Sequence, residues 1–250
     1  MRAAAQNTAM CANILFMNID WKASRMQVHP NREGRRPMDA NMLLIANTIA
    51  GVVRQMNPAM ICMCEVGERN EPLSADQMQQ LSTQVISAWQ HAAAEQIQLR
   101  SMFTTGSPYM TIYIDGPLQC TKHKMLPKLY HVKGEPRDAQ TFVCSLPDGE
   151  NVEVINIHAP SGKDKLTDRQ RQELLTNMLQ SSSQAKLGYT IGNAHFLIGG
   201  DMNTYMPKMA QLLSECRDSG SLHTHAQMHE PYMAMHLSLI HISEPTRPSQ

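Results

Sequence analysis

The chain has 250 residues, which suffice for one large domain or two small ones with a sizeable core. Its 22 basic and 22 acidic residues balance, so no overall field draws it to nucleic acid or to a membrane, and any such attraction has to be local. No apolar run approaches the roughly 18 residues of a membrane-spanning helix.

Six cysteines are scattered along the chain, and they indicate reduced core thiols instead of a disulfide framework. Cys62 and Cys64 lie in an apolar run that is typical of a buried strand. The first residues, Met1 to Ala5, lack the long apolar core of a signal peptide. We therefore expect an intracellular protein, either cytoplasmic or nuclear.

The first part of the chain alternates strand and helix patterns. An apolar run predicts a strand over 13–19, and a polar, basic loop is expected over 22–36. Apolar residues at helical spacing predict an amphipathic helix over 39–56, which ends before Pro58. The apolar run 59–64 predicts a second buried strand.

A helix and several strands are predicted next. Ser74 and Gln77 have the spacing of a capping box, which predicts the start of a second helix. A pair of strands is expected between 96 and 115. Residues 141–146 and 151–158 flank a Pro/Asp/Gly turn, and this pattern predicts a β-hairpin.

The rest of the chain returns to helix and strand patterns. A third helix is predicted to begin at Thr167, where Gln170 completes a second capping box, and a strand is predicted over 194–198. A short helix follows Pro207. This mixed order favours an α+β fold, with helices packed outside mixed β-sheets, over a purely parallel, doubly wound fold.

The last segment of the chain resembles a sequence that is not part of a natural protein. Residues 237–247 match the in-frame translation of a transposase sequencing adapter. We therefore expect residues 1–236 to form the native domain and residues 237–250 to be a non-native tail. A coincidental natural tail is the alternative.

Polar residues follow four of the predicted strands, at the point where each strand ends. They are Asn18 with Asp20, Glu65, His158, and Asp201 with Asn203. Side chains at the carboxyl ends of neighbouring strands project into one cleft. Gly, Asp and Asn are also common turn residues, so a simple turn after residue 198 is the alternative for the last pair.

This set of side chains suits phosphodiester hydrolysis. Mg²⁺ takes one or two protein carboxylates, and water and phosphate complete its coordination. An imidazole can supply or take up a proton, and amides can hold phosphate oxygens without adding negative charge. Arg25 and Arg36, in the loop after Asn18, can bind substrate phosphates, although a solvated basic loop explains them as well. Lys122 and Lys124 are expected on a wet surface.

The segments that carry these residues resemble motifs of the endonuclease/exonuclease/phosphatase superfamily, in the same order along the chain. The matching segments are 14–21, 58–66, 154–162 and 196–204, and the resemblance spans residues 12–236. It implies the deoxyribonuclease I-like fold, a four-layered α/β/β/α sandwich. It also implies a Mg²⁺-dependent phosphoesterase of the nuclease or phosphatase type.

The resemblance also implies a role for each strand-end residue. Glu65 matches the direct ligand of Mg²⁺ (or Mn²⁺), and Asp20 matches an acid that some branches have near the metal. Asp201 and Asn203 match the pair that orients the attacking water and the phosphate. His158 matches the histidine of the deoxyribonuclease, deadenylase and sphingomyelinase branches. Asn18 matches the phosphate-binding amide after the first strand.

One departure from the family pattern lies near the end of the chain. The family closes its site with a Ser-Asp-His motif, and no Asp follows Asp218 here. We therefore expect a fold without its last strand, and impaired activity in this chain. The alternatives are a non-catalytic remnant that binds phosphate ligands or a partner, and a zinc-binding module built on His223, His225 and His229, which a polar loop explains as well.

Overall fold

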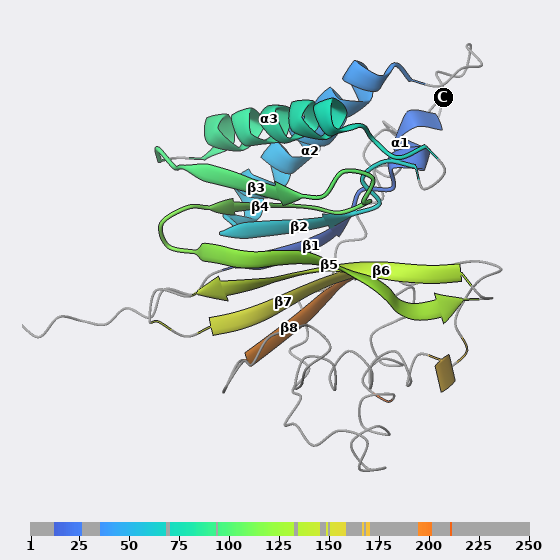
Figure 1. Cartoon of the computed structure of the whole chain (residues 1–250). Coiled ribbons are helices and arrows are strands. Elements are labelled where there is room, and N and C mark those ends of the chain that lie inside the picture. The colour runs from blue at the N-terminus through green and yellow to red at the C-terminus, as the bar shows by residue number, and fades with distance from the viewer. Residues whose placement is uncertain are drawn as a thin grey trace, which may run out of the picture.

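The computed structural model describes residues 13–26, 36–68, 71–93, 95–132, 135–145, 151–158 and 195–201, together with positions 149, 167, 169, 170 and 211. These residues form two stacked four-stranded β-sheets, and two long helices cover the free face of the first sheet (Figure 1). None of the described helices is both long and apolar enough to span a membrane.

The first sheet has the strand order β1-β2-β4-β3. β1 (Ile14–Asn18) pairs in parallel with β2 (Met60–Cys64), and the pairs that β4 (Met110–Ile114) makes with β2 and with β3 (Leu99–Phe103) are antiparallel. All five residues of β2 are buried, which explains its unbroken apolar sequence.

The second sheet has the strand order β5-β6-β7-β8. β5 (Gln119–Val132), β6 (Glu135–Ser145) and β7 (Asn151–His158) form an antiparallel meander, and β8 (His195–Asp201) pairs in parallel with β7. Both sheets therefore combine parallel and antiparallel pairs, as the mixed order of elements predicted.

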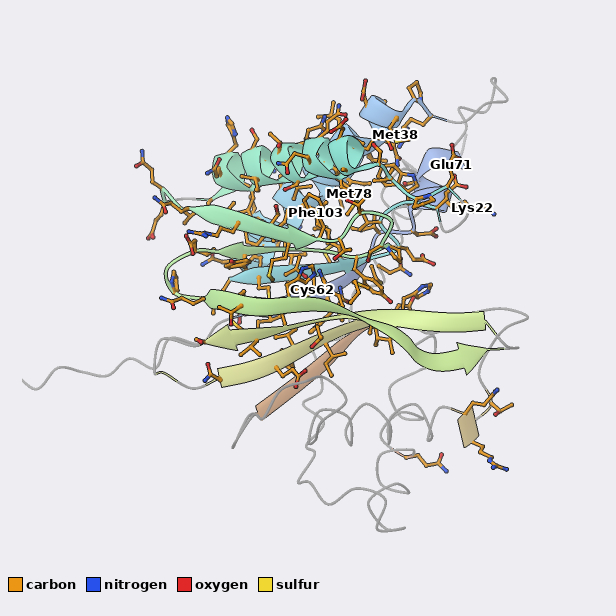
Figure 2. All side chains as sticks on the ribbon, in the orientation of Figure 1. Lys22, Met38, Cys62, Glu71, Met78 and Phe103 are labelled. Atoms are coloured by element: carbon orange, nitrogen blue, oxygen red, sulfur yellow. The ribbon has the colours of Figure 1, made fainter. Side chains whose placement is uncertain are left out.

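α2 (Met38–Met56) and α3 (Ala75–Ala92) form the outer layer on the first sheet (Figure 1). α3 begins at the predicted capping box, in which Ser74 and Gln77 exchange hydrogen bonds of 3.2 and 2.9 Å. In Figure 2, Met78 and Phe103 lie between α3 and the first sheet, and Cys62 lies between the two sheets. The chain therefore buries one apolar layer under the helices and a second layer between the sheets.

The predicted strands and helices over residues 13–115 and the hairpin before His158 are confirmed, and two local expectations are wrong. α1 (Trp21–Met26) occupies the start of the predicted basic loop, because Trp21 is buried and anchors a helical turn there. No strand was predicted where β5 lies, and the side chains of its Lys122 and Lys124, which were expected on a wet surface, are outside those described. β8 continues to Asp201, beyond its predicted end at 198.

Other expectations concern residues that lie largely outside those described. Thr167 and Gln170 make the reciprocal hydrogen bonds of the predicted capping box, at 2.9 and 3.3 Å, but the rest of that helix is not among the described residues. The helical layer on the outer face of the second sheet, the short helix after Pro207 and the tail 237–250 also lie outside them.

The cysteines of the first sheet are buried, as predicted. Cys62 and Cys64 are free and have no exposed surface, and burial raises the pKa of the Cys62 thiol to about 12. A thiol with such a pKa stays protonated at neutral pH and behaves as a small apolar side chain.

A line of polar side chains is buried between the sheets and joins them. The hydroxyl of Thr111 in β4 donates to Oε1 of Gln140 in β6 at 2.7 Å, and Nε2 of Gln140 donates to the Met102 carbonyl in β3 at 3.2 Å. Nδ2 of Asn156 in β7 donates to the Met63 carbonyl in β2 at 3.0 Å. Unlike apolar contacts, these bonds are directional, so they specify how one sheet is placed on the other.

Two glycines in β8 lie too close to neighbouring strands for a side chain, one against β1 and the other against β7. A Cβ atom on Gly199 would overlap the ring of Phe16 in β1. Gly200 has a φ of +125°, and a Cβ atom there would overlap the Ile157 carbonyl. Only glycine fits at these two positions, because one contacts the opposite sheet and the other has a left-handed backbone.

We predict that Gly199→Ala destabilises the fold by about 1–3 kcal/mol, because the methyl group forces the ring of Phe16 away from β8. Gly51→Ala is the matched control, since that glycine lies within α2 and its added Cβ meets nothing within 4 Å. The control is expected to be stabilising by about 0.5–1 kcal/mol. Urea unfolding measures both, and a Gly199→Ala variant as stable as the parent would contradict the close approach.

A second prediction concerns pH. Nε2 of His123 in β5 lies 3.1 Å from Nε2 of Gln140, so the ring nitrogen accepts a hydrogen bond from the amide and the ring is neutral. Burial lowers the pKa of His123 below its usual 6.5. As pH falls below about 6.5, the unfolded chain binds a proton that the folded chain excludes, so the free energy of unfolding decreases.

Urea unfolding between pH 7.5 and 5.5 tests this prediction. His123→Gln keeps an acceptor for the Gln140 amide and removes the titration, so its stability is expected to depend less on pH than that of the parent. His91→Gln, on the exposed side of α3, is the control and should follow the parent. Parallel pH profiles for the parent and His123→Gln would show that this histidine does not carry the effect.

Candidate active site

Four predicted site residues meet at one edge of the stacked sheets. β1 runs parallel to β2, with Asn18 beside Cys64, and β7 runs parallel to β8, with His158 beside Asp201. Contacts between β1 and β8 and between β2 and β7 align the two pairs of strands. The carboxyl ends of all four strands therefore lie at the same edge, as the sequence predicted.

Asn18 and Asp201 connect the two sheets at this edge. Nδ2 of Asn18 donates to Oδ2 of Asp201 at 2.8 Å, and Oδ1 of Asn18 accepts from the backbone N–H of Asp20, also at 2.8 Å. In β1, Asn18 follows Phe16 on the face toward the second sheet, because alternate residues of a strand share a face. The close approach at Gly199 brings Asp201 within reach of this amide.

Glu65 reaches the site through a local distortion. It follows β2 directly, and strand alternation would send its side chain toward the helices, as it does for Ile61 and Met63. Glu65 instead has a φ of 56°, which breaks the alternation. Its Oε1 lies 3.2 Å from Nε2 of His158, which belongs to the other sheet.

The turn after β1 is also left-handed. Asp20 has a φ of 43°, and its carbonyl accepts the N–H of Ser24 in α1 at 3.0 Å. The N–H of Trp21 donates to the Glu65 carbonyl at 3.2 Å, so this turn binds the end of β2. Left-handed conformations of non-glycine residues store strain that the surrounding structure must hold, and such residues are typical of functional sites.

The carboxylates at this edge of the sheets disfavour the ionised form of Glu65. Burial raises the pKa of Glu65 above its usual value of 4.5, and the carboxylates of Asp20 and Asp201 raise it further, whereas His158 and the amide of Asn18 act in the opposite direction. The side chains of His158 and Glu65 keep 22% and 33% of their surface exposed. The site is therefore partly removed from water and still open to a ligand.

We tested whether these residues suit a divalent metal. No group of three or more His, Cys, Asp or Glu side chains in the described parts of the chain is arranged to hold one. Mg²⁺, however, is held by one or two protein carboxylates, and water and substrate oxygens complete its coordination. The partly buried carboxylate of Glu65, with Asp20 and Asp201 close enough to raise its pKa, supplies that donor type. The donor set therefore fits a hard divalent cation.

The structure does not bring every predicted residue to this edge. Asn203 lies outside the described residues, and so does the side chain of Arg25, whose backbone is in α1. Arg36 precedes α2 and is partly buried; its Nη1 has no hydrogen-bond partner among the described residues. No described contact joins Arg36 to the four strand ends.

Two residues at the site had no predicted role. The hydroxyl of Tyr109, in the segment before β4, accepts the backbone N–H of His158 at 3.1 Å. Asn156 lies two residues before His158 in β7 and binds the first sheet. A polar residue within the apolar run of β7 was a visible signal for Asn156, whereas a single tyrosine in a loop offers no such signal.

No family model matches the sequence, and no curated protein matches it. Several solved structures are similar. TDP2 of D. rerio, solved with a single-strand DNA product, has a TM-score of 0.48 and 12% identity, with 80% of this chain and 62% of that one covered. ANGEL2, a 2′,3′-cyclic phosphatase, has a TM-score of 0.45 and 11% identity, with 77% of this chain and 52% of that one covered.

The human Nocturnin catalytic domain, solved with a bound sulfate anion, has a TM-score of 0.38 and 12% identity, with 64% of this chain and 57% of that one covered. This chain thus spans less than two thirds of each of these three structures. Its own sheets have the α+β arrangement that the motifs predicted, and the four strand-end residues meet at one edge. The described residues thus form two mixed sheets with helices on one outer face (Figure 1), which are three of the four layers of the sandwich that the sequence motifs predicted.

Proposed function

We propose that this chain is built as a divalent-metal-dependent phosphoesterase that hydrolyses phosphodiester or phosphate-ester bonds. One observation supports this most: Asn18, Glu65, His158 and Asp201 come from four different strands and meet at one partly buried edge. A carboxylate, an imidazole, an amide and a second carboxylate are the groups that such a hydrolysis uses. We assign this activity to residues 1–236 and none to residues 237–250.

In this proposal each residue has a separate task. Asp201, oriented by the amide of Asn18, accepts a proton from the attacking water, and Asn203 helps to hold that water in place. His158 donates a hydrogen bond to a phosphate oxygen or to the leaving group. Water attacks the phosphorus atom, and the bond to the leaving oxygen breaks. Arg25 and Arg36 are the candidate phosphate contacts, and Nη1 of Arg36 has no hydrogen-bond partner among the described residues that a phosphate would displace.

Glu65, with Asp20 beside it, would hold Mg²⁺ or Mn²⁺. When bound, the metal supplies positive charge that neutralises the phosphate and the crowded carboxylates. The positive charge also favours the ionised form of Glu65, whose pKa is raised by burial.

The substrate class follows from the chemistry of the site only as far as a phosphate ester. Nucleic acid is the first macromolecule to test, followed by phospholipid head groups and inositol phosphates. The four described cysteines that are free, Cys62, Cys64, Cys120 and Cys144, support the proposal of a reducing, intracellular compartment.

Because the sequence lacks the Ser-Asp-His motif, we predict weak Mg²⁺-dependent cleavage of at least one of three probes: bis(p-nitrophenyl) phosphate, p-nitrophenyl phosphate and a labelled single-stranded oligonucleotide. Asp201→Asn and His158→Ala are each expected to lower kcat about 10²–10⁴-fold. Glu95→Gln, an exposed acid after α3, is the control and should be fully active. Binding of inorganic phosphate without cleavage of any probe would favour the non-catalytic alternative, and binding of neither metal nor phosphate would overturn both.

A metal-linked change in stability gives a test that is independent of turnover. Because the pKa of Glu65 is raised, folding favours its protonated form, so this residue destabilises the fold as pH rises above about 4.5. Glu65→Gln is therefore expected to raise the free energy of unfolding at pH 7 without metal. Mg²⁺ at 100 times its Kd should stabilise the parent by about 2.7 kcal/mol and leave Glu65→Gln unchanged.

Urea unfolding with and without Mg²⁺ measures both effects, and Glu95→Gln again serves as the control, because it should respond to the metal as the parent does. Equal stabilisation of the parent and Glu65→Gln by Mg²⁺ would show that the metal binds elsewhere.

A further inference from the structure

Asn156 is a polar residue in the apolar centre of β7. Its neighbours Val154, Ile155 and Ile157 are buried, and Asn156 itself has no exposed surface. Its Oδ1 has no hydrogen-bond partner among the described residues, and leaving a buried acceptor unpaired costs free energy. An apolar side chain of similar size would avoid this cost, so the presence of an amide here needs an explanation.

The hydrogen bond made by the nitrogen of the same amide explains why an asparagine is present here. Nδ2 of Asn156 donates to the Met63 carbonyl in β2 at 3.0 Å, across the space between the sheets. The assignment of the amide atoms is firm, because two oxygens facing each other at this distance would repel. Asn156 precedes His158 by two residues, and Met63 precedes Glu65 by two residues. The bond therefore lies one strand repeat, about 6–7 Å, behind the contact between His158 and Glu65.

The segment before β4 also contacts the end of β7 and the residue that follows Glu65. The hydroxyl of Tyr109 accepts the N–H of His158 at 3.1 Å, and the neighbouring Pro108 carbonyl accepts the N–H of Val66 at 2.9 Å. The short segment before β4 thus binds one residue beyond Glu65 and binds His158 itself. Asn156 and this segment together fix the end of β7 against the end of β2.

We propose that Asn156 is a positioning residue, whose hydrogen bond to Met63 sets the distance between His158 and Glu65. Asn156 is too deeply buried to touch a substrate, so it acts through His158. Its effect on turnover rests on the proposed phosphoesterase function, whereas its effect on the site geometry does not. A misplacement of about 1 Å in a catalytic group can lower a rate about 100-fold, so a single buried bond can control activity.

The first test measures geometry and needs no turnover. In ¹³C-edited NMR spectra of the metal-free protein, the parent should show a nuclear Overhauser contact between the His158 ring and the Glu65 side chain. This contact should be lost in Asn156→Ala and kept in Val154→Ala, a control on the same strand and face that also leaves a cavity. Circular dichroism confirms that each variant is folded. An intact contact in folded Asn156→Ala would overturn the proposal.

Two further variants keep the proposal testable if Asn156→Ala does not fold. Asn156→Leu keeps the approximate size of the side chain and cannot donate to the Met63 carbonyl, so the contact should again be lost. Tyr109→Phe removes only the hydroxyl that accepts the N–H of His158, and it should weaken the contact without leaving a cavity. If Asn156→Ala does not fold, a contact retained in Asn156→Leu overturns the proposal, and its loss supports it.

The second test measures turnover of bis(p-nitrophenyl) phosphate with Mg²⁺. Asn156→Ala should lower kcat about 10- to 100-fold with little change in KM, and Val154→Ala should retain the parent kcat. In the His158→Ala background, Asn156→Ala should cause no further loss, because both changes remove the same group. Additive losses would assign Asn156 to stability alone and overturn the proposal.

The two tests separate the claims. If the parent cleaves no probe but the NMR contact depends on Asn156, the proposed phosphoesterase function fails and the positioning of His158 by Asn156 stands. If the parent is active and the contact does not depend on Asn156, the positioning proposal fails by itself.

Discussion

The buried hydrogen bonds between the two sheets are the constraint on which the rest of the structure depends. Burial of apolar surface favours contact between the two sheets without fixing how they are placed on each other. Each hydrogen bond between the first sheet and Gln140 or Asn156, in contrast, forms in only one placement of the sheets. Because β2 and β7 are aligned in this way, their carboxyl ends lie at the same edge of the stacked sheets. The contact between His158 and Glu65 follows from that alignment. A slide of one residue between the sheets, about 3.3 Å along the strands, would separate the two side chains.

The site itself combines close approach with strain. The absence of a side chain at Gly199 lets β8 lie close to β1, and Asp201 then accepts a hydrogen bond from the amide of Asn18. Glu65 enters the same space through a left-handed backbone. The result is an edge at which carboxylates are crowded and partly desolvated, as the raised pKa of Glu65 indicates. Such an arrangement is unfavourable without a cation, and natural proteins keep unfavourable sites where a ligand relieves them.

Much of this site could be predicted from the sequence, because each of its four residues directly follows or ends an apolar run. Strand ends are visible to pattern analysis, and so are the capping boxes of the helices. The partner of Asn156 was not visible, since Met63 lies 93 residues away and contributes a backbone carbonyl that any residue would have. The left-handed turn of Glu65 was equally hidden, because a non-glycine residue with positive φ has no sequence signature. β5 was not predicted as a strand, because its lysines interrupt the alternation of apolar and polar residues.

The central claim is that the four strand ends form a metal and phosphate site, and crystals of this chain grown with Mn²⁺ test it most directly. Anomalous scattering locates the metal without reference to turnover. The account predicts an anomalous peak within ligand distance of the Glu65 carboxylate, at the edge that Asn18 and Asp201 share. It also predicts that Glu65 turns from His158 toward the metal. A structure with Mn²⁺ bound only elsewhere, and with Glu65 still against His158, would contradict it.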